Sequence, residues 1–397
     1  MRILPALLLT LALPAQSETL SQELGRTGLA ATEARLSTLP TPSDAETFAY
    51  GGVLFLRAIE GSFQERWTLG LTDRTGMLPL LRLPLQDNPN PAPFEPKAIV
   101  NLFAHAADRL QKAQGHLIGI PDTSDFGLEI ALDDLWFDVN SDGSRSMGEG
   151  IGDILGAAVM GGMEGSGTAP QPLPTIRFDV ADAACLAAYA DLLGGICAMV
   201  QAYDPTEPIT RVMSARAAME RLGPVEADPF FGGSSNPDVF DMIAILLATL
   251  NQTPDSGKMM QAKQNFRSMV AGNRLFWTRI AAENDNDKEW LPNDAQQSAL
   301  GIPVPPGTGA AWLAVLSDLD AVLSGEKLVP YWRVGGSVGV NVGAMFTDPR
   351  PIDLAGWVQG WAALPYLEQG PLVSPDSLAA FDMLTSGQAM LYAIYLN

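Results

Sequence analysis

The chain has few basic side chains and very few of the side chains that bind zinc or form disulfides. Its 397 residues include 24 Lys and Arg against 45 Asp and Glu, for a formal net charge of −21, and only 2 His and 2 Cys. Nucleic acid and anionic membranes require positive charge that neutralises phosphate, so neither is an expected partner. His105 and His116 would lie about 16 Å apart on one helix, too far to share a zinc ion.

The two cysteines are poorly spaced for a disulfide. Cys185 and Cys197 fall in one expected helix, where twelve residues correspond to about 18 Å. A disulfide needs Cα atoms within about 7 Å of each other. Unless the helix breaks at Gly194-Gly195, we expect two buried thiols without a bridge.

Motifs that identify several enzyme classes are missing. The sequence holds no H-E-x-x-H metalloprotease pair, no P-loop and no G-x-G-x-x-G dinucleotide fingerprint. Carboxylate pairs such as Asp133-Asp134 suit acid–base chemistry, but surface acids have the same appearance in a sequence. Composition and motifs therefore do not identify an enzyme.

Residues 138–149, D-V-N-S-D-G-S-R-S-M-G-E, have the donor spacing of a calcium loop. Oxygen donors are needed at positions 1, 3 and 5, glycine at 6, a carbonyl at 7, a polar side chain or water at 9, and a bidentate Glu at 12. Those positions hold Asp138, Asn140, Asp142, Gly143, Ser144, Ser146 and Glu149. The segment resembles an EF-hand loop, which implies Ca²⁺ as the ligand of these residues. The alternative interpretation is a polar turn that alternates by chance.

The resemblance covers the loop and not its surroundings. Arg145 stands at position 8, where paired EF-hands carry a branched apolar residue, and no second loop of similar quality occurs. We therefore expect a solitary site. The incoming segment 128–137 alternates apolar and polar residues and fits a short strand or a poor helix. The sequence therefore does not establish a helix–loop–helix.

A second acidic run, E-N-D-N-D-K-E at 283–289, begins like a calcium loop. Asp285, Asp287 and Glu289 alternate, but Trp290 occupies the glycine position and Gln296 the twelfth. The run fails as an EF-hand loop. Two interpretations remain: metal ligation, including a remote contribution to the loop at 138–149, or a solvated turn that ends the preceding helix.

The first 17 residues have the pattern of a secretory signal peptide. Arg2 precedes an apolar run and small residues near Ala15. No later segment reaches the ~18 consecutive apolar residues of a spanning helix. We expect a periplasmic or secreted protein with no transmembrane segment after removal of the signal peptide.

Residues 18–397 are expected to form a mainly α domain, a multi-helix bundle or solenoid-like unit. One β-hairpin at most is expected, from 328–334 and 338–342, and a candidate internal boundary lies near 161–175. The apolar run 237–250 predicts a deeply buried helix. Helical patterns cover 46–67, 97–115, 180–203, 237–250, 256–282, 309–323, 353–366 and 375–396.

The sequence therefore predicts an exported, acidic, calcium-binding protein whose single site stabilises the fold. Its wider role is expected to be that of a binding or interaction module rather than an enzyme. Two alternatives stay open: a calcium-stabilised hydrolase of cell-envelope polymers and a calcium-responsive regulator.

Overall fold

Helices make up most of the fold, as the sequence predicts. The computed structural model describes residues 18–71, 83–154, 172–223 and 237–396. Its longer helices are α1 (Leu20–Leu36), α2 (Asp44–Thr68), α3 (Lys97–Ile118), α5 (Val180–Tyr203), α6 (Thr206–Leu222), α7 (Pro237–Leu250), α8 (Ser256–Ile280) and α9 (Thr308–Ser324). The shorter ones are α10 (Val342–Thr347), α11 (Leu354–Gln359), α12 (Asp376–Leu384) and α13 (Ala389–Tyr395).

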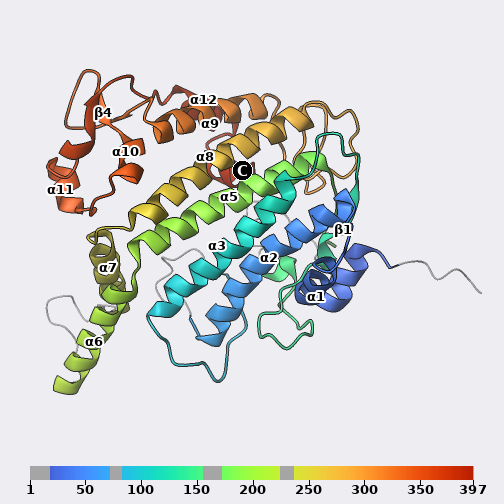
Figure 1. The fold of residues 1–397 in the computed structure, drawn as a ribbon, viewed down its shortest axis with the longest axis horizontal. Coiled ribbons are helices and arrows are strands. Elements are labelled where there is room, and N and C mark those ends of the chain that lie inside the picture. Colours follow the sequence, from blue (N-terminus) through green and yellow to red (C-terminus); the bar gives the residue numbers. More distant parts are fainter. Residues whose placement is uncertain (1–17, 72–82, 155–171, 224–236, 397) are drawn as a thin grey trace, which may run out of the picture.

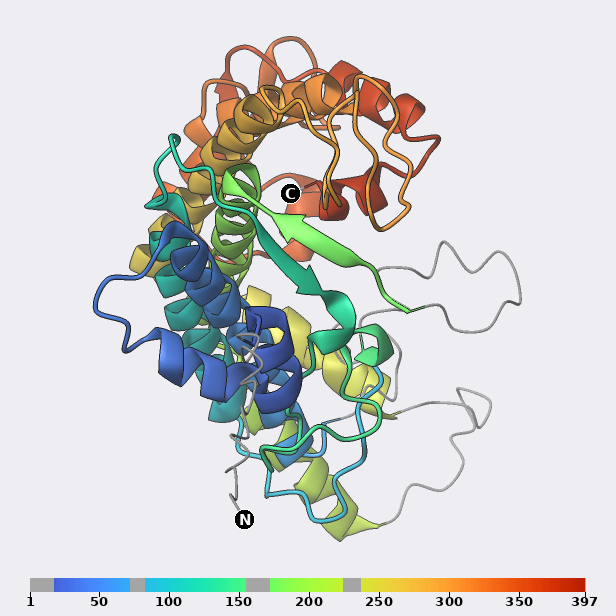
Figure 2. The ribbon, with the colours of Figure 1, turned by 90° about the vertical axis from the view of Figure 1, so that its right-hand side faces the viewer.

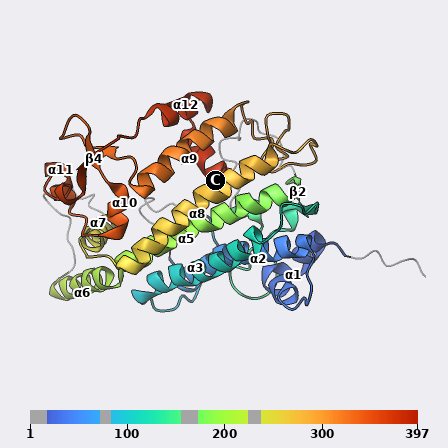
Figure 3. The same ribbon diagram turned by 45° about the horizontal axis from the view of Figure 1, so that its top comes forward.

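Four long helices form the central layer of the molecule. Figures 1 and 3 show α2, α3, α5 and α8 side by side in that order, with α9 beyond α8. Small residues allow the close approach of α5 and α8: a Cβ added at Gly272 of α8 would lie 3.2 Å from the Cβ of Ala188. Both cysteines lie on α5, reduced and buried, as predicted.

By length and composition, α5 is also apolar enough to cross a bilayer. In the fold it lies between α3 and α8, and 56% of its most apolar stretch is buried. A core helix of a globular domain has the same apolar character, because all of its faces meet other elements.

Two small antiparallel sheets accompany the helices. Strand β1 (Leu128–Ala131) pairs with β2 (Thr175–Phe178), and Figure 2 shows this hairpin crossing the molecule beside the central helices. A short 3₁₀ helix, η2 (Leu132–Asp134), follows β1. The second sheet has the order β3-β4-β5, from Val329–Pro330, Val338–Val340 and Leu367–Gln369. Pairing of β3 with β4 confirms the expected hairpin.

Three expectations about the helices are wrong. The expected helix at 353–366 ends early, because α11 stops at Gln359, Gly360 has a φ of +123°, and Leu364–Tyr366 form only a short 3₁₀ helix. In α7, the side chains of Phe240 and Leu246 are 51% and 56% exposed, because the main helical neighbour of α7 in the described chain is α6. The expected C-terminal helix is divided into α12 and α13 because the chain turns at Ser386 and Gly387, which both have positive φ.

Two expectations from the sequence fall outside the described chain. The expected signal peptide, residues 1–17, lies there entirely, and most of the candidate boundary at 161–175 does as well. The described end of that boundary, Thr175, begins β2 and pairs with Ala131.

Candidate calcium site

The acidic loop (residues 138–149) is closed by a short antiparallel bridge. The N–H of Phe137 donates to the carbonyl of Glu149 at 2.8 Å, and the N–H of Ile151 donates to the carbonyl of Leu135 at 2.9 Å. The incoming chain is therefore extended, whereas the outgoing residues 151–154 are helical. The surroundings differ from a helix–loop–helix because an isolated bridge replaces the first helix.

Helix α2 holds the first residue of the acidic loop. Oε1 of Glu60 accepts the N–H of Asp138 at 2.8 Å, and the amide of Gln64 donates to the Asp138 carbonyl at 2.8 Å. The other carboxylate oxygen of Glu60 accepts a hydrogen bond from Arg57. Glu60 is fully buried, so this ion pair compensates its charge. The start of the loop is thus fixed to a long helix.

Within the loop, the acidic side chains turn toward backbone amides. The two carboxylate oxygens of Asp138 accept the N–H groups of Asp142 and Gly143, each at 3.0 Å. Oδ1 of Asn140 also accepts from Asp142, and Oδ1 of Asp142 accepts from Ser144 at 2.8 Å. Gly143 has a φ of +73°, a conformation that a side chain disfavours. These contacts point the donors at positions 1, 3 and 5 into one turn.

Glu149 closes the loop from its far end. Its exposed fraction is 0%. Oε1 accepts the N–H of Val139 at 3.1 Å and Oε2 accepts the N–H of Ser146 at 2.7 Å. Among the described residues, no Lys, Arg or His forms an ion pair with Glu149. A buried carboxylate normally requires a positive partner, and neutral amides supply only part of that stabilisation.

The remaining polar residues of the loop, Ser144, Arg145 and Ser146, make different kinds of contact. The guanidinium of Arg145 donates to the carbonyl of Asp133 at 2.9 Å and so leaves the loop interior. Ser144 and Ser146 each donate their backbone N–H to an acidic side chain of the loop. Position 7 contributes its carbonyl in a calcium loop, so only the backbone of Ser144 is required there.

A second group of acidic residues lies in the segment after α8, next to β2. The carboxylate oxygens of Glu283, Asp285 and Glu289 lie within 4.8 Å of one another, a spacing that the acids of the loop do not share. We call these three residues the acidic cluster. Burial raises the pKa of Glu283 to about 7, and neighbouring Asp179 adds to the rise.

The acidic cluster already has a cationic neighbour. Arg177 of β2 lies 3.8 Å from Asp285 and 3.6 Å from Asp287, and the amide of Gln296 donates to Glu283 at 3.1 Å. Asp287 contacts Arg177 and is not part of the cluster. The described ion pairs and hydrogen bonds of these acids are made with β2 and the adjoining turn, and none is made with the acidic loop. A remote contribution to the loop is therefore not supported.

One motif was missed by the sequence analysis. Residues 335–339 read G-G-S-V-G, the G-x-S-x-G pattern of a nucleophile elbow. An elbow requires a strand-to-helix turn with histidine nearby. Ser337 instead lies in the turn between β3 and β4, and the two histidines of the chain lie on α3. The pattern marks a glycine-rich hairpin turn here.

Comparison with known proteins identifies no relative. No protein-family model, curated protein or solved structure matches the chain. The function must therefore be inferred from the geometry of the acidic loop and from the remaining surfaces and cavities of the described chain.

Proposed function

We propose that the protein binds one Ca²⁺ in the acidic loop and that the ion stabilises the fold. The observation that carries this proposal is Glu149, a fully buried carboxylate at the twelfth position with only backbone amides as described partners. A hard dication with oxygen ligands suits this donor set. The ligands would be Asp138, Asn140, Asp142, the carbonyl of Ser144, Ser146 and Glu149.

A stabilising role follows from how the loop is connected. Three carboxylates in one turn repel one another, and a bound dication would offset this repulsion. Glu60 and Gln64 fix one end to α2, and the bridge beside Glu149 fixes the other. A ligand that binds only the folded chain raises its stability by RT ln(1 + [L]/Kd).

The proposed location of the protein is outside the cytoplasm. This rests on the signal-peptide pattern of residues 1–17 and on the match between a solitary loop and the ~10⁻⁴–10⁻³ M affinity of extracellular calcium modules. We also propose that the protein acts as a binding module. The fixed ends of the acidic loop favour a stabilising ion over a switch that opens a helix pair.

Calorimetry of the purified, chelator-treated chain tests the proposal. We expect one calcium equivalent to bind at or below millimolar concentration and to raise the melting temperature. Glu149→Gln should weaken calcium binding at least tenfold and abolish the calcium-dependent rise. Glu283→Gln, in the acidic cluster, is the matched control and should leave calcium binding unchanged. If the unaltered chain gives no heat with millimolar calcium, the proposal is wrong.

A further inference from the structure

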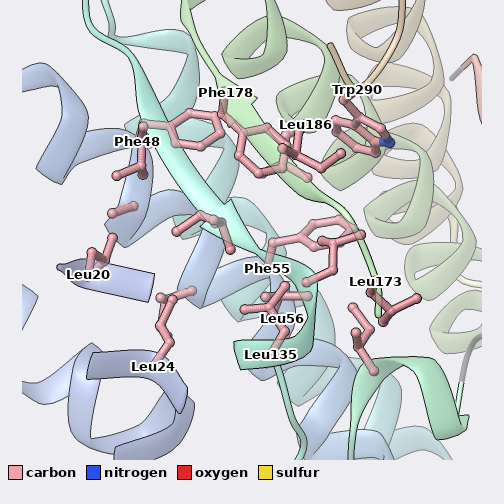
Figure 4. A pocket seen from close by; sticks show the side chains of 18 of the residues that line it. Leu20, Leu24, Phe48, Phe55, Leu56, Leu135, Leu173, Phe178, Leu186 and Trp290 are labelled. Carbon is pink, nitrogen blue, oxygen red and sulfur yellow. The ribbon is translucent and has the colours of Figure 1, made fainter. Parts of the chain in front are cut away.

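An apolar cavity of about 300 Å³ lies between α2 and the β1–β2 hairpin. Figure 4 shows its side chains converging from α1, α2, both strands, α5 and the segment after α8. Every lining residue is apolar or glycine. Protein interiors are close-packed and rarely leave voids much larger than a water molecule. A cavity of this size and composition is typical of a ligand site.

The lining residues extend along much of α2. They follow α2 from Phe48 to Ile59, a distance of about 16 Å at 1.5 Å per helical residue. A volume of about 300 Å³ spread over this length gives a channel with room for one unbranched hydrocarbon chain rather than two side by side. Since a 150 Å³ cavity holds one benzene, about twelve carbons fit.

Gly52 keeps the middle of the cavity open. A Cβ added at Gly52 would meet only Cδ2 of Leu186, at 3.8 Å. Gly52 lines the cavity, so a larger side chain at this position would extend into the channel.

The charges around the cavity disfavour an anionic ligand. Glu129, between the lining residues Leu128 and Ile130, is paired with Lys288 at 2.8 Å, and Asp133 follows Leu132. The other nearby cation, Arg177, is already close to three aspartates. With a net charge of −21, the protein repels carboxylate and phosphate head groups.

We infer that this cavity binds the single hydrocarbon tail, about twelve carbons long, of an uncharged lipid such as a monoacylglycerol. The tail lies along α2 between Phe48 and Ile59, and the uncharged head group remains outside the apolar lining. This inference does not depend on calcium binding by the acidic loop.

Titration of the purified chain with 1-monododecanoylglycerol, below its aggregation concentration, tests the inference. We expect one equivalent to bind, and dodecanoate to bind at least tenfold more weakly. Gly52→Met should fill the channel, weaken binding at least tenfold and raise the melting temperature. Gly61→Met is the matched control: it lies on the opposite face of α2, where an added Cβ meets nothing within 4 Å, and should bind as the unaltered chain does.

A fluorescence measurement keeps the test independent of the folding of the Gly52 variant. Trp290 lines the cavity, so a monoacylglycerol brominated on its tail should quench tryptophan emission in the unaltered chain. The quenched fraction should fall in Trp290→Phe. Absence of binding by the unaltered chain overturns the inference, and so does Gly52→Met binding with full affinity. Quenching that is unchanged in Trp290→Phe would place the tail elsewhere and also overturn it.

Discussion

Oε1 of Glu60 accepts the backbone N–H of Asp138 at 2.8 Å, across 78 positions of the sequence. Glu60 is fully buried and is paired with Arg57 on the same helix. Through this contact, the first residue of the acidic loop is placed by the middle of α2. The helix that positions the loop also forms one wall of the apolar cavity.

Removal of the Glu60 side chain is expected to affect the loop and the fold together. Glu60→Ala leaves Arg57 with only Glu33 as its described ion-pair partner. It also leaves the N–H of Asp138 without its acceptor. We therefore expect the free energy of unfolding to fall by about 3 kcal/mol. Glu60→Gln keeps an oxygen for Asp138 and should retain more of the calcium affinity. Urea denaturation and calcium calorimetry measure the two effects. Equal calcium affinity in both variants would contradict this role of Glu60.

Calcium and the monoacylglycerol are expected to strengthen each other's binding. Leu135 and Ile151 both line the cavity, and the hydrogen bond between their backbones closes the acidic loop. Ordering of the loop by calcium therefore orders part of the cavity wall. Linkage requires the two effects to be equal in size. Titration of each ligand with and without the other measures them, and Glu149→Gln should abolish the coupling while leaving lipid binding in chelator unchanged.

Gly28→Ala is expected to destabilise the protein by about 2–4 kcal/mol. Gly28 has a φ of +76°, and an added Cβ would lie 2.7 Å from Cζ2 of Trp136. Trp136 cannot move freely, because it is buried and its ring N–H donates to the carbonyl of Leu24. Gly61→Ala, at an open position in a helix, should raise stability instead. Chemical denaturation of both variants provides the comparison.

Asp191 is expected to make stability fall as pH rises. Burial raises the pKa of Asp191 from 3.8 to about 7, against a smaller opposing hydrogen bond from Gln114. Between these values the unfolded chain loses the proton that the folded chain keeps, so the folded state loses stability up to about pH 7. The loss is at most about 4 kcal/mol, at about 1.4 kcal/mol per pKa unit.

Asp191→Asn should remove this pH dependence. Urea denaturation should show the variant to be only slightly more stable than the unaltered chain near pH 4.5. The difference in stability should be largest above pH 7. A gain that is the same at both pH values would contradict the raised pKa of Asp191.

The two cysteines are expected to resist thiol reagents in the folded protein. Burial raises the pKa of Cys185 well above its usual range and that of Cys197 to about 12. Thiolate is the reactive form, so both should be unmodified by iodoacetamide at pH 8. Both should react in denaturant, as counted by mass spectrometry. Rapid modification of either residue in the folded chain would contradict this burial.

Local signals in the sequence predicted much of the helical architecture. Ser43 and Glu46 form a capping box at the start of α2, where a helical pattern was predicted, and α5 covers the predicted residues 180–203. Such caps depend on residues three positions apart. The donor spacing of the acidic loop is equally local, which is why the candidate ligands were identifiable without a structure.

Contacts between distant segments were not predictable in the same way. Strand β2 was missed because its pairing with β1 joins 175–178 to 128–131, and its four residues alone give little pattern. The apolar character of α7 indicated burial but did not show which element would cover it. For the same reason, Glu60 and Gln64 gave no sign that they contact Asp138. The cavity beside Gly52 depends on seven separate segments.

Because α5 lies between α3 and α8, its two sides can be covered only at different times during synthesis. When α5 leaves the ribosome, α3 is already available to cover one side of it, but residues 204–255 must be synthesised before α8 begins. During that interval the alanine- and leucine-rich side that later faces α8 is open to other chains. The nascent protein therefore has to be kept from aggregating until α8 is complete, and its central layer can form only late in synthesis or after it.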